Sequence, residues 1–145
     1  MNFSYNWLKE YIDGKLPDAK KLGEILMFHS FEVEAVEKQG KDWVLDIDVL
    51  PNRAHDCLSH IGIAREIVAI LNLKLKLPQA TPKQDNNLKI KDFVRAEVDE
   101  PKDCIRYCAI YLKDIQVKSS PAWLQEKIKS CGLQAINNIV DATNF

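Results

Sequence analysis

The sequence has little of what marks the more specialised classes of protein. Only five glycines and six prolines occur among 145 residues, which excludes collagen-like and low-complexity chains. No uncharged apolar run approaches the length that crosses a bilayer, and the first residues do not form a basic segment followed by an apolar one. We therefore expect no membrane span and no secretory signal.

Charge of one sign is not in excess either. Twenty Lys and Arg residues face twenty-one Asp and Glu residues, so the net charge is −1. This balance excludes a strongly basic nucleic-acid-binding protein and an acidic disordered tail. The 46% hydrophobic and 28% charged residues are ordinary for a soluble globular protein.

Motifs for catalysis and for metal binding are also missing. The sequence contains no glycine-rich phosphate loop, no GxSxG and no HExxH. No two cysteines have CxxC spacing, so a zinc site of the usual kind is not expected. Without a secretory signal we expect a cytoplasmic protein whose thiols are reduced and half-buried, namely Cys57, Cys104, Cys108 and Cys131.

What is present predicts an α+β fold, with a small domain of three helices and a β-hairpin at residues 1–76. Each helix has a candidate N-cap: Ser4, Asp18 and Asp56. Phe3 is placed to pack on Leu8, as in a hydrophobic staple. For the third helix, apolar residues at helical spacing predict a buried face of Cys57, Ile61, Ala64, Val68 and Leu71.

Two segments with alternating apolar and acidic residues predict the hairpin. The strands span residues 31–37 and 43–50, and residues 38–42 form the loop. Residues 31–50 hold six acids and two lysines, a net charge of −4. Because such a surface repels phosphates, we do not expect RNA contacts there.

Residues 77–92 are rich in Pro, Gln and Asn and predict a linker between two domains. A second domain is expected at residues 93–145, with strands at 93–98 and 106–112. A helix follows, with Ser120 as N-cap, Pro121 at its first position and Gly132 just past its end. Its buried face is expected to hold Leu124, Ile128 and Cys131. Residues 137–145 have helical spacing but no stop signal, so this domain looks incomplete.

Two groups of side chains could carry chemistry, and each has a simpler explanation. His55, Asp56, Cys57 and His60 are the densest set of potential metal ligands, yet they fit a capped helix start with a solvated histidine, and we expect no metal. Four acids of the hairpin could form an acid–base cluster but also fit its solvated face: Glu32, Glu34, Asp46 and Asp48. The residues alone indicate no catalytic site.

Three separated segments closely resemble the bacterial phenylalanyl-tRNA synthetase β subunit. They are residues 4–8 (SYNWL), 45–66 (LDIDVLPNRAHDCLSHIGIARE) and 132–145 (GLQAINNIVDATNF). Their order and spread imply that the chain is an N-terminal fragment of this longer subunit. The resemblance further implies that residues 93–145 begin an α/β editing domain, which hydrolyses tyrosine wrongly attached to phenylalanine tRNA.

Within the family motif, Thr143 and Asn144 match positions that line the editing pocket. The His and Glu that complete the pocket in the family lie beyond Phe145, so no complete catalytic set is expected in this fragment. Without the resemblance, ordinary polarity on a helix surface would explain both side chains. The isolated fragment is therefore expected to be inactive.

The resemblance also implies partners and cofactors for the parent enzyme. There the β subunit joins an α subunit in a heterotetramer, and the α subunit uses ATP and Mg²⁺ to activate phenylalanine; we expect no cofactor in this chain. Most bacterial members carry an OB-fold tRNA-binding domain between the hairpin strands. A short loop around Gly40 replaces it here, so we expect weak or no tRNA binding. Two alternatives remain open: a non-catalytic binding or scaffold module from the same family, and a free-standing deacylase.

Overall fold

The structure is a computed structural model that describes residues 1–145. It has α+β architecture, as the sequence predicts. The helices are α1 (Tyr5–Glu10), α2 (Ala19–His29), α3 (Ala54–Cys57), α4 (His60–Leu71), α5 (Ala122–Ser130) and α6 (Asn138–Asn144), with 3-10 turns at Pro51–Arg53 and Ile90–Asp92. The strands are β1 (Asn2–Ser4), β2 (Ile12–Asp13), β3 (Glu32–Gln39), β4 (Asp42–Asp48) and β5 (Lys74–Leu75).

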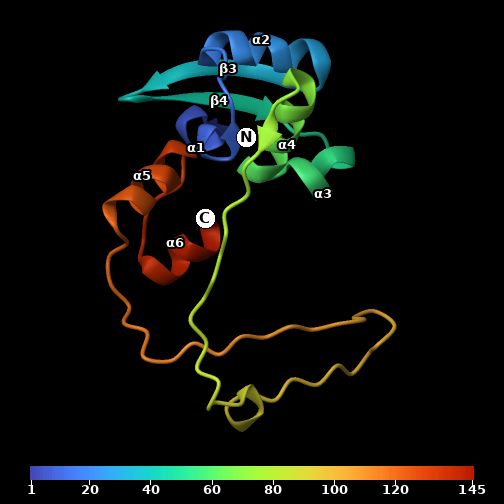
Figure 1. The fold of residues 1–145 in the computed structure, drawn as a ribbon, viewed down its shortest axis with the longest axis vertical. Helices are drawn as coiled ribbons and strands as arrows, with labels where there is room; N and C mark the ends of the chain where they lie inside the picture. The colour runs from blue at the N-terminus through green and yellow to red at the C-terminus, as the bar shows by residue number, and fades with distance from the viewer. The chain divides into compact units, whose positions relative to one another are not determined.

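Internal contacts divide the chain into two units, and the boundaries of these units are not those of the predicted linker. One unit joins Met1–Gln79 with Val117–Phe145, and the other is Ala80–Gln116. Helices α5 and α6 thus belong to the same compact unit as the N-terminal elements (Figure 1). The predicted family domains at 1–76 and 93–145, and the linker at 77–92, stay predictions about the longer subunit.

The hairpin forms as predicted and lies in a three-stranded antiparallel sheet of order β1-β4-β3. Its turn is tighter than expected, because Gln39 pairs with Asp42 and only Gly40 and Lys41 lie between them. Gly40 has φ +58°, which suits the glycine at the first central position of a type II′ turn. The short strand β1 extends the sheet by pairing Phe3 with Leu45.

Two of the three helix caps predicted for residues 1–76 are confirmed. The Ser4 hydroxyl accepts a hydrogen bond from the Trp7 N–H, and the Asp18 carboxylate accepts one from the Lys21 N–H. Asp56 is not a cap, and the prediction for it is wrong. Ser59 caps α4 by accepting from the Gly62 N–H, and the Asp56 carboxylate instead binds Arg53.

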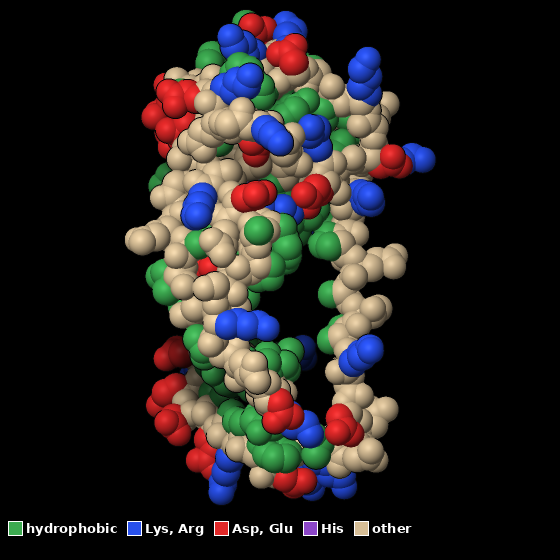
Figure 2. Space-filling view, turned by 90° about the vertical axis from the view of Figure 1, so that its left-hand side faces the viewer, with side chains coloured by type: hydrophobic (Ala, Val, Ile, Leu, Met, Phe, Trp, Pro, Cys, Tyr) green, Lys and Arg blue, Asp and Glu red, His purple; other side chains and the backbone are tan.

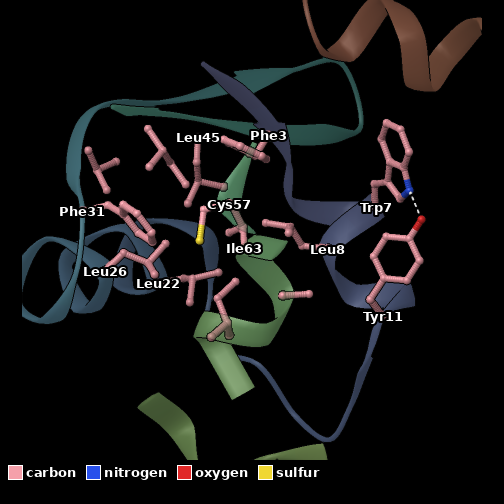
Figure 3. Close-up of a cluster of buried hydrophobic side chains, with 14 of the residues drawn as sticks. Phe3, Trp7, Leu8, Tyr11, Leu22, Leu26, Phe31, Leu45, Cys57 and Ile63 are labelled. Carbon is pink, nitrogen blue, oxygen red and sulfur yellow. Dashed lines mark hydrogen bonds between the residues drawn. The ribbon is translucent and has the colours of Figure 1, made fainter. Parts of the chain in front are cut away.

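One hydrophobic core fills the space between the sheet and the helices (Figure 3). Helix α2 packs along β3, α1 packs against β4, and α4 packs against α1 (Figure 1). The buried face of α4 consists of Ile63, Ala64 and Ile67, so the predicted stripe through Ile61 and Val68 is shifted, and those two are only half-buried. None of the helices is long and apolar enough to span a membrane.

The predicted strands at residues 93–98 and 106–112 are absent, so this prediction is wrong for the described chain. The two segments are rich in strand-forming residues, yet neither pairs with another strand. A strand is stable only when a neighbour accepts its backbone hydrogen bonds. The apolar side chains of these segments consequently remain exposed, with Ile110 and Leu112 at 86% and 70%.

The close approach of α4 to α3 yields a stability test. A methyl group at Gly62 would lie 1.9 Å from the backbone oxygen of Asp56, whereas one at Gly23 would meet a movable Val36 methyl at 2.7 Å. We expect Gly62→Ala to lower the free energy of unfolding by about 2–3 kcal/mol. Gly23→Ala should cost under about 1 kcal/mol, because alanine also favours the helix. Urea unfolding measures both, and equal losses would contradict this packing.

Candidate functional site

A cavity of about 530 Å³ opens between the N-terminal elements and the last two helices of the first unit. Aromatic and apolar side chains form most of its wall, and a few polar groups interrupt them. Its walls include Trp7, Tyr11, His60, Ile128, Asn144 and Phe145. A largely apolar cavity with a few polar groups is the usual form of a small-molecule site.

Trp7 of α1 is the central side chain of this wall. One face of its indole stacks on His60 at 3.8 Å between ring centroids, and the other stacks on Phe145 at 4.8 Å. Its Nε1–H donates a hydrogen bond of 2.9 Å to the Tyr11 hydroxyl, drawn as a dashed line in Figure 3. Both faces and the polar edge of Trp7 are thus occupied within the chain.

His60 is a neutral imidazole in this arrangement. Burial, assisted by the nearby Lys127 charge, lowers the pKa of His60 to about 3. Its Nε2 accepts a hydrogen bond of 3.0 Å from the Ser4 N–H, which leaves the proton on Nδ1. Because the Nε2 lone pair is already used, His60 is poorly suited to act as a general base or a metal ligand.

The two residues singled out by the resemblance lie in or beside this cavity. Asn144 lines it, and its side chain makes no hydrogen bond within the chain. The Thr143 hydroxyl donates a 2.7 Å hydrogen bond to the Val140 carbonyl one turn back in α6. Asn144 is therefore free to contact a ligand, while Thr143 is occupied by its own helix.

Sequence reasoning missed Asp141, which is fully buried at the start of α6. Its carboxylate accepts a 2.9 Å hydrogen bond from the Ile136 N–H and a 2.5 Å hydrogen bond from the Ser120 hydroxyl. The Ile136 bond, followed by the Ser120 bond, lowers the pKa of Asp141. The signal in the sequence that could have indicated this buried carboxylate is an Asp among the apolar residues of 139–142.

This network corrects the predicted start of α5. The helix begins where Ser120-Pro121 predicts, but Pro121 takes the N-cap position and the Ser120 hydroxyl binds Asp141 instead of the helix backbone. The end of the helix is confirmed, since Gly132 follows the C-cap with φ +78°. Leu124 and Ile128 form the buried face as expected, whereas Cys131 is half-buried.

The potential metal ligands at the start of α3 and α4 do not converge. Arg53 binds Asp56 and Glu66 at 2.9 Å each, and its guanidinium also reaches the Cys57 sulfur. Burial is the main cause that raises the pKa of Cys57 to about 11, so its thiol stays protonated. His55 points to solvent with a 78% exposed side chain, and no group of three or more His, Cys, Asp or Glu residues is placed to hold a metal.

The acidic residues of the hairpin are also dispersed. Asp46 Oδ1 lies 2.6 Å from the Met1 ammonium, which is a partly exposed ion pair of small expected value. Glu32 pairs across the strands with Asp48, and both are exposed. These positions fit the solvated face that the alternation predicts.

Comparison with known proteins connects both ends of the chain to one family. The model of the B3/4 domain matches residues 103–145, which include α5 and α6. All 145 residues align at 37% identity with the phenylalanine–tRNA ligase β subunit of Rhodopirellula baltica. The chain belongs to the phenylalanine–tRNA ligase β-subunit family. The resemblance of the three sequence segments is thereby confirmed.

Other β subunits of this family match large parts of the chain. Identity is 36% over 140 residues with the β subunit of Geobacillus kaustophilus, covering 94% of this chain, and 42% over 113 residues with that of Moorella thermoacetica, covering 77%. The matches take up 21%, 16% and 14% of these three relatives. The chain thus spans about a fifth or less of the β subunits that it matches.

The buried carboxylate predicts a specific response to acid. Because its folded-state pKa is lowered, Asp141 stabilises the fold above its unfolded pKa, and this contribution is lost as the pH falls through the folded value. We expect Asp141→Asn to lower stability at pH 7 and to flatten the dependence of unfolding free energy on pH below pH 4. The matched control is Asp13→Asn at an exposed position. Urea unfolding from pH 7 to pH 2 checks this, and an unchanged slope in Asp141→Asn would contradict it.

Proposed function

We propose that this chain supplies the N-terminal module and the first part of the editing module of a phenylalanine–tRNA ligase β subunit. The parent enzyme would attach phenylalanine to its tRNA in an ATP-dependent reaction. Support comes from the match over all 145 residues and from the B3/4 match over residues 103–145. In this proposal the N-terminal core is a scaffold and the end of α6 is part of a site.

We propose that Asn144 and Thr143 form part of the wall of an editing pocket, in which tyrosyl-tRNA(Phe) is hydrolysed. The observation that carries this is the Asn144 side chain, which lines the aromatic cavity without an internal hydrogen-bond partner. Tyrosine differs from phenylalanine by one hydroxyl, which a hydrophobic pocket rejects poorly, so a second hydrolytic site is the expected solution. An amide such as Asn144 can both donate to and accept from a bound substrate or water.

Hydrolysis here would depend on positioning a water molecule, because the chain offers no activated nucleophile beside Asn144. The nearest Cys–His pair is Cys131 and His60, with 4.0 Å between Sγ and Nε2. Nε2 already accepts from the Ser4 N–H, and burial raises the pKa of Cys131. A protonated thiol beside an occupied imidazole does not form a nucleophilic pair. Orientation of water and substrate is the contribution left to these residues.

The partners follow from the same proposal. The α subunit would complete a heterotetramer and would bind ATP and Mg²⁺, while tRNA(Phe) would be held mainly outside this chain.

One observation favours the alternative of a purely scaffolding module. Phe28 and Met27, in the last turn of α2, are 86% and 56% exposed, and neither lines the cavity. Paired exposed apolar side chains are typical of a surface that packs on another protein. If Asn144 has no role in hydrolysis, docking through such a surface is the remaining function.

We expect this chain to bind tRNA only in the non-specific range, with Kd on the order of 10⁻⁴ M or weaker at physiological salt. Lys and Arg are interspersed with acids on the face shown in Figure 2, and no continuous basic patch forms there. Titration of labelled tRNA(Phe) into the chain measures this. A submicromolar complex that survives raised salt would contradict it.

Asn144→Ala tests the proposed pocket in the complete β subunit assembled with its α subunit. We expect deacylation of tyrosyl-tRNA(Phe) to lose about 1–3 kcal/mol of transition-state stabilisation, the value of a lost buried hydrogen bond. Thr143→Ala should cost less, because its hydroxyl binds the Val140 carbonyl. Phenylalanine attachment serves as the control and should be unchanged. The 145-residue chain alone should show no deacylation, and a fully active Asn144→Ala enzyme would disprove the assignment.

A further inference from the structure

We propose that Lys127 is a positioning residue, whose ammonium docks the α5–α6 helix pair on the N-terminal core and thereby sets the place of Asn144 on the cavity wall. Lys127 itself does not line this cavity and would touch neither substrate nor water there. Its effect would pass through Phe145, the neighbour of Asn144. The functional part of this inference rests on the proposed editing role of Asn144, and the docking part does not.

The ammonium of Lys127 lies among three aromatic rings. The distances from Nζ to the ring centroids are 5.1 Å for Trp7, 5.3 Å for Phe145 and 5.7 Å for Trp123. All three are within the range of cation–π attraction. The rings also contact one another, since Phe145 stacks on Trp7 and meets Trp123 edge-on at 5.6 Å.

Glu10 fixes the same ammonium from the other side. Its Oε2 lies 2.5 Å from Nζ, and the Lys127 side chain is only 18% exposed. Shielding from water strengthens both the ion pair and the cation–π contacts relative to a fully exposed pair. Lys127 also lies in the last turn of α5, where the helix dipole favours a positive charge.

One cation thus joins three elements that are distant in sequence. Glu10 ends α1, Lys127 belongs to α5, and Phe145 follows α6. Phe145 has its backbone N–H bonded to the Asp141 carbonyl, so the ring and the end of α6 move together. Loss of the charge would leave three rings without their shared partner and Glu10 unpaired. The end of α6, with Asn144, is the part that we expect to loosen.

Hydrogen exchange of the 145-residue chain tests the docking. We expect Lys127→Met, which keeps the apolar stem, to accelerate exchange of the α6 amides by about tenfold while the α4 amides keep their rates. Lys127→Arg retains the cation and should restore protection. Lys129→Met is the matched control, because Lys129 lies on the same helix, is exposed and is not the lysine that lies over the three aromatic rings. Unchanged α6 rates in Lys127→Met would overturn the proposal, as would equal acceleration in α4 and α6.

Deacylation by the complete enzyme tests the functional part. We expect Lys127→Met to lower kcat for tyrosyl-tRNA(Phe) hydrolysis by about tenfold with a smaller change in KM, because orientation rather than contact is lost. Lys127→Arg should recover the rate, and phenylalanine attachment should not change. If Asn144→Ala impairs hydrolysis but Lys127→Met does not, the positioning role is wrong. If neither does, the editing proposal itself fails, whereas the exchange result still decides the docking.

Discussion

The two-sided stacking of Trp7 is the interaction on which the compact unit depends. His60 at the start of α4 covers one face of the indole, and Phe145 after α6 covers the other. Trp7 itself belongs to α1, so three parts of the chain converge on one ring. Because aromatic side chains bury large apolar areas, such a contact can join segments that share little else. It explains why α5 and α6 pack with residues 1–79 across the intervening segment.

The stack constrains the charges around it. A neutral His60 is compatible with a face-on contact to Trp7 and with the Lys127 ammonium nearby, whereas a protonated one would bring two cations together. The only charged group with no exposed surface, Asp141, is stabilised by an N–H and a hydroxyl without a counter-ion. Buried polarity in this unit is therefore satisfied mainly by hydrogen bonds. The partly shielded ion pair of Glu10 with Lys127 joins the N-terminal segment to α5.

Features that depend on neighbouring residues could be predicted from the sequence, whereas features that depend on contacts between distant residues could not. Ser4 and Asp18 were identified as caps because each stands directly before an apolar helical pattern. Asp56 and Ser59 are both good caps three residues apart, and only the tertiary pairing of Asp56 with Arg53 decides between them. Ser120 failed as a cap for the same reason, because Asp141 takes its hydroxyl. The strands expected at 93–98 and 106–112 have the right composition but no partner, which composition cannot reveal.

The residues of the candidate site also differ in whether the sequence could identify them. Asn144 and Thr143 came from resemblance to a family motif, and the structure adds that only Asn144 has a free side chain at the cavity. Trp7, Lys127 and Phe145 were not identified as site neighbours, since no spacing rule brings residues more than a hundred positions apart together. His60 was considered as a metal ligand because of its sequence neighbours, yet its environment is set by Ser4 and Trp7.

Cleavage of the folded chain within Ala80–Gln116 is the most direct measurement of whether the two ends form one unit. A sequence-specific protease site inserted in that segment would cut the chain after folding, and gel filtration would follow the pieces. The account predicts that the piece with residues 1–79 and the piece with residues 117–145 elute together in native buffer and separate in urea. Separation in native buffer, with the N-terminal piece still folded, would contradict it.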